Sequence, residues 1–336
     1  MSVSEPASND VSATQSDVLR LRDGMRTASL NIVILCGPAS TEDRAYYEAT
    51  PRDRLSVLSL RNALGRLGSK RVDVLDITTK AAWHAELPAY DLVVVNLHGE
   101  PGEDGRIQGL LTCLGLPFVG SGIEASALAL NKHLTKLVAL AEGVPTPPSF
   151  VLSDGVGPPS GSTVLQGRSI CKPLRGGSSL GMQLVAAGDV LPENGHWLIE
   201  EYVEGTDVTV TVIDLDGRLV ALPAIAIAHG RDRYTASSKL DEPTDGHQLA
   251  ARPQALLPAL SACEDLSIRM HRALGARHIS RSDFRVPSVG EPQFLELNTL
   301  PGMSERSLTA ACARVGGWDY DDFVAVLVGS ALGLRA

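Results

Sequence analysis

Two short segments in the C-terminal third place polar side chains at alternate positions of apolar strands. Arg281 and Asp283 flank a serine in ISRSDFRV, and Glu296 and Asn298 flank a leucine in QFLELN. Alternate residues of a β-strand point to the same face, so each pair is expected to share a face. Two carboxylates and an amide oxygen on adjacent strands are hard ligands that suit Mg²⁺ beside nucleotide phosphates. Solvated strand faces with one salt bridge would give the same pattern.

A lysine and a Gly/Ser-rich loop form the second candidate group. Lys172 ends the strand expected in RSICKP, and the following residues contain three glycines together with Ser178 and Ser179. Glycine lets backbone N–H groups approach a phosphate closely, and serine hydroxyls add donors. The order differs from a P-loop, where the lysine follows the glycines. A surface hairpin is the alternative for this segment taken alone.

Three further segments carry candidate ligand groups. The loop at 298–308 breaks at a Pro-Gly pair and offers backbone N–H groups and Ser307 to a carboxylate or phosphate. The backbone of 200–203 can pair with an adenine edge, and Asp207 can accept ribose hydroxyls. His98 directly follows DLVVVNL, and ligand loops lie at the carboxyl ends of parallel strands. Taken singly, the loop is also compatible with a plain turn and His98 with a structural histidine, and the 200–207 segment is more typical of a solvated strand end.

Alternating strands and helices must position these groups. LNIVILC (30–36), RVDVLDI (71–77) and DLVVVNL (91–97) are mostly apolar runs typical of buried parallel strands. Residues 53–67 place leucines and a valine at helical spacing, which predicts a helix between the first two strands. This order predicts a doubly wound α/β lobe over 29–123.

Two further lobes and a tail complete the predicted organisation. A small α+β lobe covers 124–205, where Asn131 is expected to cap a helix. A third lobe covers 206–336. Residues 1–28 are expected to be a mobile tail, with a short helix around 16–24 as an option. The elements expected in the third lobe are strands at 208–214, 218–228, 280–286 and 293–297 and helices at 254–274 and 320–333.

Composition narrows the function classes. The 336 residues are 44% hydrophobic, enough for a sizeable core, and the net charge of −9 argues against nucleic-acid binding led by bulk charge. The sequence contains no apolar run of about 18 residues, so no membrane-spanning helix is expected. The first residues, MSVSEPASNDVSATQSD, lack the features of a secretory signal, so a cytoplasmic location is expected. The five cysteines contain no CxxC pair, so neither a zinc site nor a disulfide framework is expected.

Together and in this order, the segments resemble the D-alanine–D-alanine ligases of the ATP-grasp superfamily. The resemblance covers residues from about 30 to 335 and is carried by HGEPGEDGRIQGLL, ICKPLRGGSSLGM, LIEEYVEGTDVTV, SRSDF and FLELNTLPGMSERSL. It implies a three-lobed ATP-grasp fold that grips ATP between the central and C-terminal lobes. It also implies that ATP drives the ligation of two small-molecule amino acids through an acyl phosphate. The metal cofactor it implies is Mg²⁺ or Mn²⁺, bound as two ions. A homodimer through the first lobe and a role in peptidoglycan synthesis follow from the same likeness.

The resemblance assigns roles to individual residues. The residues matched to ATP contacts are Lys132, Lys172, Ser178, Ser179, Glu200, Glu201, Tyr202, Val203, Asp207 and Lys239. The residues matched to metal ligands are Asp283, Glu296 and Asn298. The residues matched to catalysis and the amino-acid pockets are Glu42, His98, Ser178, Arg281, Gly302, Ser307 and Leu308. Among these, Glu42 is matched to the ammonium of the first substrate, and Arg281 with Gly302 to the tetrahedral intermediate. Ser307 and Leu308 are matched to the carboxylate of the second substrate.

Two departures from the family pattern border the amino-acid pockets. The closing loop of the family carries a Lys-Tyr pair, whereas Lys239 is followed here by Leu240. A leucine cannot donate or accept a hydrogen bond, and loss of that hydroxyl in relatives accompanies acceptors other than D-alanine. The second departure is the stretch 43–53 after Glu42, where the family continues directly into a serine-containing helix.

Three alternatives to a D-alanine–D-alanine ligase follow. A specialised ligase would make another dipeptide or a depsipeptide in biosynthesis or resistance. An ATP-binding regulator would have little need of the complete lysine and metal set. A carboxylate kinase that stops at the acyl phosphate would not need the second carboxylate anchor at Ser307 and Leu308.

Overall fold

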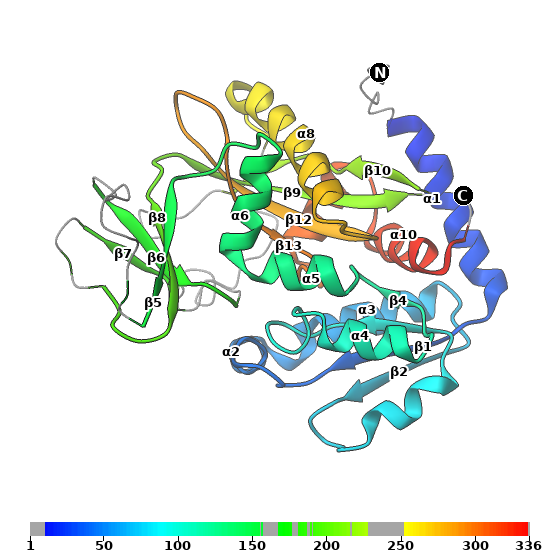
Figure 1. Cartoon of the computed structure of the whole chain (residues 1–336). Helices are drawn as coiled ribbons and strands as arrows, with labels where there is room; N and C mark the ends of the chain where they lie inside the picture. The colour runs from blue at the N-terminus through cyan, green and yellow to red at the C-terminus, as the bar shows by residue number, and fades with distance from the viewer. Residues whose placement is uncertain are drawn as a thin grey trace.

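The structure is a computed structural model (Figure 1). It describes residues 11–334 except 155, 157–166, 177–180, 187–188, 190, 216 and 228–251. Over the described residues the strands form three sheets, each built from its own stretch of sequence. No helix within these ranges is long and apolar enough to cross a membrane. The α/β class is therefore confirmed.

The first sheet is parallel throughout. Its strands in order are β2 (Arg71–Asp76), β1 (Asn31–Cys36), β3 (Leu92–Val95) and β4 (Phe118–Val119). β1 and β3 are almost wholly buried, as expected for apolar strands inside a parallel sheet. Because β1 pairs with both β2 and β3, the segments after β1 and β3 lie at one edge of the sheet. Those two segments carry Glu42 and His98.

Short helices connect the strands of this sheet. They are α2 (Thr41–Ala49), the 3₁₀ turns η1 (Arg52–Arg54) and η2 (Trp83–Ala89), α3 (Ser56–Arg66) and α4 (Arg106–Cys113). The helix predicted at 53–67 is confirmed as α3, which begins later because a 3₁₀ turn precedes it. The side chain of Ser40 caps α2 by accepting a hydrogen bond from the Asp43 backbone at 2.8 Å.

The second sheet is antiparallel and forms a separate layer at the left of Figure 1. Its strands in order are β5 (Ser149–Ser153), β8 (His196–Glu201), β6 (Ser169–Pro173) and β7 (Gln183–Val185). Two helices precede it, α5 (Ile123–Leu130) and α6 (Lys132–Ala141). The predicted cap is confirmed, because Asn131 Oδ1 accepts from the backbone N–H groups of His133 and Leu134, each at 3.2 Å.

The third sheet is also antiparallel and holds the carboxylates of the candidate site. Its strands are β10 (Arg218–Ala221), β9 (Thr206–Leu215), β12 (Ile279–Val286) and β13 (Gln293–Asn298), with β11 (Ile225–Ile227) also pairing with β9. The remaining helices are η3 (Gln254–Leu256), α8 (Leu257–Ala273), α9 (Leu308–Val315) and α10 (Tyr320–Leu332). The single strand predicted at 218–228 is wrong. It breaks around Pro223, which has no N–H for a sheet hydrogen bond.

Residues 11–28 are not a mobile tail. They form α1 (Val11–Ala28), whose Val18, Leu21 and Met25 are buried, while residues 1–10 lie outside the described ranges. α1 packs along α10, where Leu21 contacts Gly329 closely enough that a methyl group there would collide with it (Figure 1). α10 also contacts α3 and β4, so the last helix of the chain completes the core of the first lobe. The lobe boundaries at 123/124 and 205/206 stay predictions.

Substituting Leu21 by alanine should lower the free energy of unfolding by about 2–4 kcal/mol, because the cavity would lie between two packed helices. Leu19→Ala is the matched control on the same helix, since the Leu19 side chain is 52% exposed. Denaturant unfolding of both variants measures the difference. Equal stability of the two variants would mean that α1 is not held on α10.

Candidate active site

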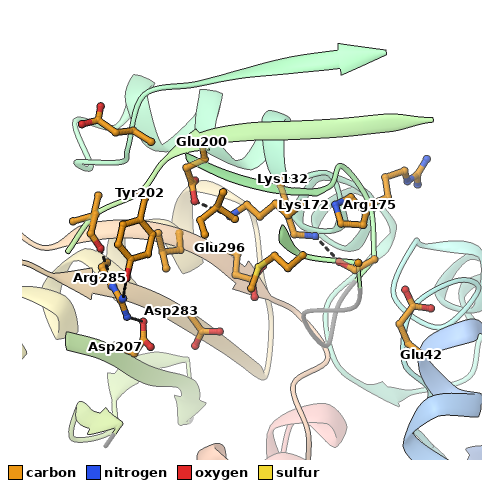
Figure 2. Close-up of a pocket in the computed structure, with 18 of the residues that line it drawn as sticks. Glu42, Lys132, Lys172, Arg175, Glu200, Tyr202, Asp207, Asp283, Arg285 and Glu296 are labelled. Carbon is orange, nitrogen blue, oxygen red and sulfur yellow. Dashed lines mark hydrogen bonds and ion pairs between the residues drawn. The ribbon is translucent and has the colours of Figure 1, made fainter. Parts of the chain in front are cut away.

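A cavity of about 330 Å³ lies between the second and third sheets and is bordered by the first lobe (Figure 2). Predicted site residues from all three lobes line it. They are Glu42, Lys132, Lys172, Glu200, Glu201, Tyr202, Val203, Asp207, Asp283 and Glu296. Figure 2 shows Glu42 reaching in from the first lobe, across from Tyr202 and Asp207. Apolar side chains, among them Ile170, Met182 and Leu295, line the cavity between the charged groups, as is typical of a small-molecule site.

A buried ion network lies on the second-sheet side of the cavity. Lys172 on β6 is 3.0 Å from Glu200 Oε1 on β8, and Lys136 on α6 is 2.5 Å from Glu200 Oε2. Burial acts to raise the pKa of Glu200, but the two lysine charges outweigh it and lower that pKa below its ordinary value. Burial lowers the pKa of Lys136. The Glu200 carboxylate is therefore held by two lysines, and the adenine contact predicted for the backbone of 200–203 stays a prediction.

The Tyr202 end of the cavity is organised by an arginine that the sequence did not single out. Arg285 on β12 is 2.6 Å from Asp207 and donates to the Tyr202 hydroxyl at 3.0 Å and the Val203 carbonyl at 2.9 Å. The guanidinium also lies 5.5 Å from the centre of the Tyr202 ring. Although burial acts to lower it, the Asp207 charge raises the pKa of Arg285. Arg285 thus joins Asp207, the predicted ribose contact, to the segment predicted to hold adenine.

The carboxylates predicted as metal ligands come together across β12 and β13. Asp283 pairs in register with Glu296, and Arg281 pairs with Asn298. The register is regular from Arg281 to Asp283, and a bulge that adds Leu295 to β13 shifts the pairing only after Asp283. The two pairs therefore lie on adjacent strands, as predicted, and the role of these residues as metal ligands stays a prediction.

Arg281 holds Asp283 through two hydrogen bonds, from Nε at 2.9 Å and from the terminal nitrogen at 2.8 Å. Although burial acts to lower it, the Asp283 charge raises the pKa of Arg281. Nδ2 of Asn298 is buried without a hydrogen-bond partner in the described structure. A second, small cavity of about 20 Å³ lies beside it, lined also by Glu103, Lys132 and Glu296. Space of that size next to an unsatisfied buried amide suits a small ligand such as a water molecule.

The oxygen atoms available here fit a hard divalent cation. Among the described residues, no three His, Cys, Asp or Glu side chains gather as a metal site. Asp283, Glu296 and the Asn298 amide are two carboxylates and one carbonyl oxygen donor, which leaves ligand positions for water or phosphate. That composition suits Mg²⁺ or Mn²⁺ rather than a soft metal.

The first lobe contributes a histidine held by an aspartate. The backbone N–H of His98 donates to Asp43 Oδ1 at 2.8 Å, and His98 Nδ1 lies 3.1 Å from the same oxygen. Although burial acts to lower it, the charges of Asp43, Glu103 and Glu42 raise the pKa of His98. Burial raises the pKa of Glu103 to about 7. His98 does not line the large cavity.

Glu42 spans the gap between the first and second lobes. Its carboxylate lies between Gly99 and Gly176, where a Cβ on either glycine would collide with it. Both glycines have positive φ, at 64° and 102°, which also favours glycine. The Gly176 carbonyl accepts a hydrogen bond from Lys132 Nζ at 2.5 Å. Glu42 and Lys132, a predicted phosphate ligand, therefore both lie against Gly176.

The loop before α9 lies outside the large cavity. Ser307 caps α9 by accepting from the Ala310 backbone at 3.2 Å, and its hydroxyl is 2.7 Å from Thr309 Oγ1. Thr309 in turn donates to the Gly302 carbonyl at 2.5 Å. Leu308 is the first residue of α9, so Ser307 and Leu308 lie at a helix N-terminus, which attracts carboxylates.

Several predicted residues are not brought to the large cavity or are not described. Arg281, Asn298, Gly302, Ser307 and Leu308 do not line it. Ser178, Ser179, Lys239 and Leu240 lie outside the described residues. The groups that sequence reasoning missed are Lys136, Asp43 and Arg285. Their only signals were proximity to Lys132, Glu42 and Asp283 in sequence.

Known proteins resemble this chain over most of its length. Residues 37–121 match the family model described as D-ala D-ala ligase N-terminus, and residues 165–329 match that described as D-ala D-ala ligase C-terminus. The D-alanine–D-alanine ligase of Gloeobacter violaceus is 36% identical, over 72% of this chain and 82% of its own. That of Cupriavidus necator is 34% identical, over 82% of this chain and 87% of its own.

Solved structures share the same fold. The D-alanine–D-alanine ligase from Bacillus anthracis complexed with ATP matches 90% of this chain and 97% of its own, with a TM-score of 0.70 and 23% identity. The enzyme from Coxiella burnetii matches with a TM-score of 0.66 and 20% identity, over 90% of this chain and 95% of its own. At this identity the likeness establishes the three-lobed ATP-grasp architecture.

Proposed function

The chain belongs to the D-alanine–D-alanine ligase family, and we propose that it is an ATP-dependent, ADP-forming carboxylate–amine ligase. The observation that supports this most is the cavity in which Lys132 and Lys172 lie with Asp283 and Glu296. That set can neutralise a nucleotide phosphate chain, while Glu42 stands at the first-lobe side for an amino-acid ammonium. The substrates are small amino acids, and D-alanine in both positions is the leading assignment.

The reaction proceeds in two steps. The γ-phosphoryl group of ATP passes to the carboxylate of the first amino acid, giving ADP and an acyl phosphate. The amine of the second amino acid then loses a proton and attacks the acyl carbon, and inorganic phosphate leaves from the tetrahedral intermediate. The residues bind and orient these groups, so catalysis depends on positioning and electrostatics.

The nucleotide is held by the second and third lobes. Lys132 and Lys172 bind phosphates, the 200–203 segment binds adenine, and Asp207, fixed by Arg285, accepts the ribose hydroxyls. The Gly/Ser loop contributes Ser178 and Ser179 to ATP binding. The segment matched to the closing loop of the family contributes Lys239. Asp283, Glu296 and Asn298 would hold Mg²⁺ or Mn²⁺, as two ions. Metal bound there would neutralise the negative charge of the phosphates.

The amino acids bind toward the first lobe. Glu42 binds the ammonium of the first amino acid. His98 supports that pocket, and Asp43 holds its imidazole ring in place. Ser307 and Leu308, at the start of α9, bind the second carboxylate. Arg281 and backbone N–H groups near Gly302 stabilise the oxyanion of the tetrahedral intermediate. A cytoplasmic location and a homodimer through the first lobe belong to the same proposal.

Purified protein with ATP and Mg²⁺ tests the proposal against single and paired D- and L-amino acids and D-lactate. Phosphate release and product mass are the readouts. Phosphate together with a D-alanyl-D-alanine mass from D-alanine alone would support the leading assignment. If no acceptor pair releases phosphate from ATP, the proposed function is wrong.

A specialised ligase is the second candidate, because two features reshape the amino-acid side. Leu240 replaces the family tyrosine, and the 43–53 stretch places the Tyr46 ring 5.0 Å from the His98 ring. Tyr46 is fixed there, since its hydroxyl accepts from the Ser56 backbone at 2.7 Å. In the substrate panel, a pair other than two D-alanines would then be the better substrate.

Leu240→Tyr should move acceptor preference toward D-alanine and away from D-lactate by about tenfold in the ratio of kcat/KM values, because one hydrogen-bonding hydroxyl is restored. Leu257→Tyr on the exposed start of α8 is the matched control and should leave the ratio unchanged. Both acceptors are compared at saturating ATP. An unaltered ratio in Leu240→Tyr would rule out this position as a determinant of the acceptor.

A further inference from the structure

Lys136 is a buried lysine that does not face the cavity. It lies one helical turn after Lys132 on α6, and its side chain is 2% exposed. Lysine is almost never buried so fully unless it is paired. Besides its ion pair with Glu200, the ammonium donates to Thr146 Oγ1 at 2.6 Å and to the Pro147 carbonyl at 3.2 Å. All three of these polar contacts are made to residues of the second lobe.

Glu200 stands between two ammonium groups. Its carboxylate is 3.0 Å from Lys172 on one side and 2.5 Å from Lys136 on the other, and its side chain is 4% exposed. Two positive charges and one negative charge leave this buried group with a net charge of +1. Without Lys136 the net charge would be zero, and Lys172 alone would have to neutralise Glu200. Because an uncompensated buried carboxylate is strongly unfavourable, Lys172 would be held on Glu200 rather than released to a ligand.

Lys136 also lies at the joint between the second and third sheets. Thr146, which accepts from Lys136, donates in turn to the Phe294 carbonyl at 2.8 Å. The Phe294 backbone N–H donates to the Pro145 carbonyl at 2.7 Å. Phe294 lies on β13, two residues before Glu296. One hydrogen-bonded chain therefore connects Lys136 to the strand that carries a predicted metal ligand.

We propose that Lys136 is a positioning residue for nucleotide binding: it neutralises Glu200, so that the charge of Lys172 is left for a nucleotide phosphate. The inference rests on the proposed function, because it places Lys172 on ATP. The competing explanation is a fold-stabilising ion pair. Such a pair would affect stability but leave nucleotide affinity unchanged.

Direct binding of AMP-PNP, a non-hydrolysable ATP analogue, with Mg²⁺ separates these explanations. Lys136→Met and Lys136→Gln should weaken AMP-PNP binding about 10- to 100-fold, the range expected for one lost charge-assisted contact. Lys136→Arg, which keeps the charge, should bind close to wild type. The double variant Lys136→Met/Glu200→Gln should recover most of the affinity, because Lys172 no longer has a carboxylate to neutralise. Lys136→Gln keeps a donor near Thr146 and serves if Lys136→Met does not fold.

Arg22→Met is the matched control for a broken ion pair that is partly buried. Arg22 lies 2.7 Å from Asp322, whose side chain is 6% exposed, in the packing of α1 on α10 and away from the cavity. The Arg22→Met substitution should lower the thermal midpoint of unfolding without changing the affinity for AMP-PNP. Wild-type affinity in both Lys136→Met and Lys136→Gln would overturn the inference, and so would a double variant as weak as Lys136→Met. Wild-type protein that binds AMP-PNP but ligates no amino-acid pair would contradict the proposed function alone.

Discussion

Glu296→Gln is expected to lower kcat about a thousandfold at ordinary Mg²⁺ concentrations, equivalent to about 4 kcal/mol of transition-state stabilisation. Glutamine keeps the shape of the side chain but removes the negative charge opposite Asp283 on the paired strand. A neutral amide is a poorer ligand for a hard cation than a carboxylate. The Mg²⁺ concentration that gives half-maximal rate should rise accordingly.

A Mg²⁺ titration of steady-state rates measures this effect. Glu291→Gln is the control, because Glu291 is an exposed residue just before β13 and does not line either cavity. The control should retain the wild-type rate and Mg²⁺ requirement. Normal activity of Glu296→Gln at ordinary Mg²⁺ would exclude Glu296 as a metal ligand.

The elements that the sequence predicts well are those with a local cause. The apolar runs of β1 and β3 require burial on both faces, and the Asn131 cap needs only its own helix. In α1, Val18, Leu21 and Met25 have helical spacing, but the segment is polar on balance and short helices depend on tertiary packing. The partner that stabilises it, α10, lies at the other end of the chain. The sequence of this segment alone therefore predicts a tail with at most a short helix.

The candidate site divides in a similar way. The i, i+2 spacing of Arg281 with Asp283, and of Glu296 with Asn298, was sufficient to place each pair on one face. The bulge next to Asp283 lies beside the packed rings of Phe284 and Phe294, whose centres are 5.7 Å apart, and it has no signature in either strand alone.

Charge partners were harder to foresee than spacing. Arg285 on Asp207 and Lys136 on Glu200 join segments that are distant in sequence. Each of these pairs changes how a predicted residue can act, because the carboxylate is already held before any ligand binds. Burial and pairing therefore have to be known before roles can be assigned to Asp207 and Glu200.

Arg281→Met is expected to lower kcat for ligation about 100- to 1000-fold, the range for losing one oxyanion donor, with little change in the KM for ATP. Arg281 does not line the large cavity, and its guanidinium is fixed on Asp283 by two hydrogen bonds. Its fixed position can meet charge that develops on the acyl oxygen without reorganisation. The kcat of Arg281→Lys should lie between those of the wild type and Arg281→Met, because lysine keeps the charge but not the paired geometry.

Trapping the acyl phosphate with hydroxylamine separates the two steps of the reaction. If Arg281 acts on the tetrahedral intermediate, Arg281→Met should still form the hydroxamate at a rate much closer to wild type than its ligation rate. Arg218→Met, on the exposed end of β10 where Arg218 pairs with Asp17, is the control and should leave both rates unchanged. Hydroxamate formation that falls as far as ligation, together with a raised KM for ATP, would place Arg281 on the nucleotide instead. Since Arg281 is also the partner of Asp283, the same variant should lower the thermal midpoint, and the ratio of the two rates distinguishes catalysis from stability.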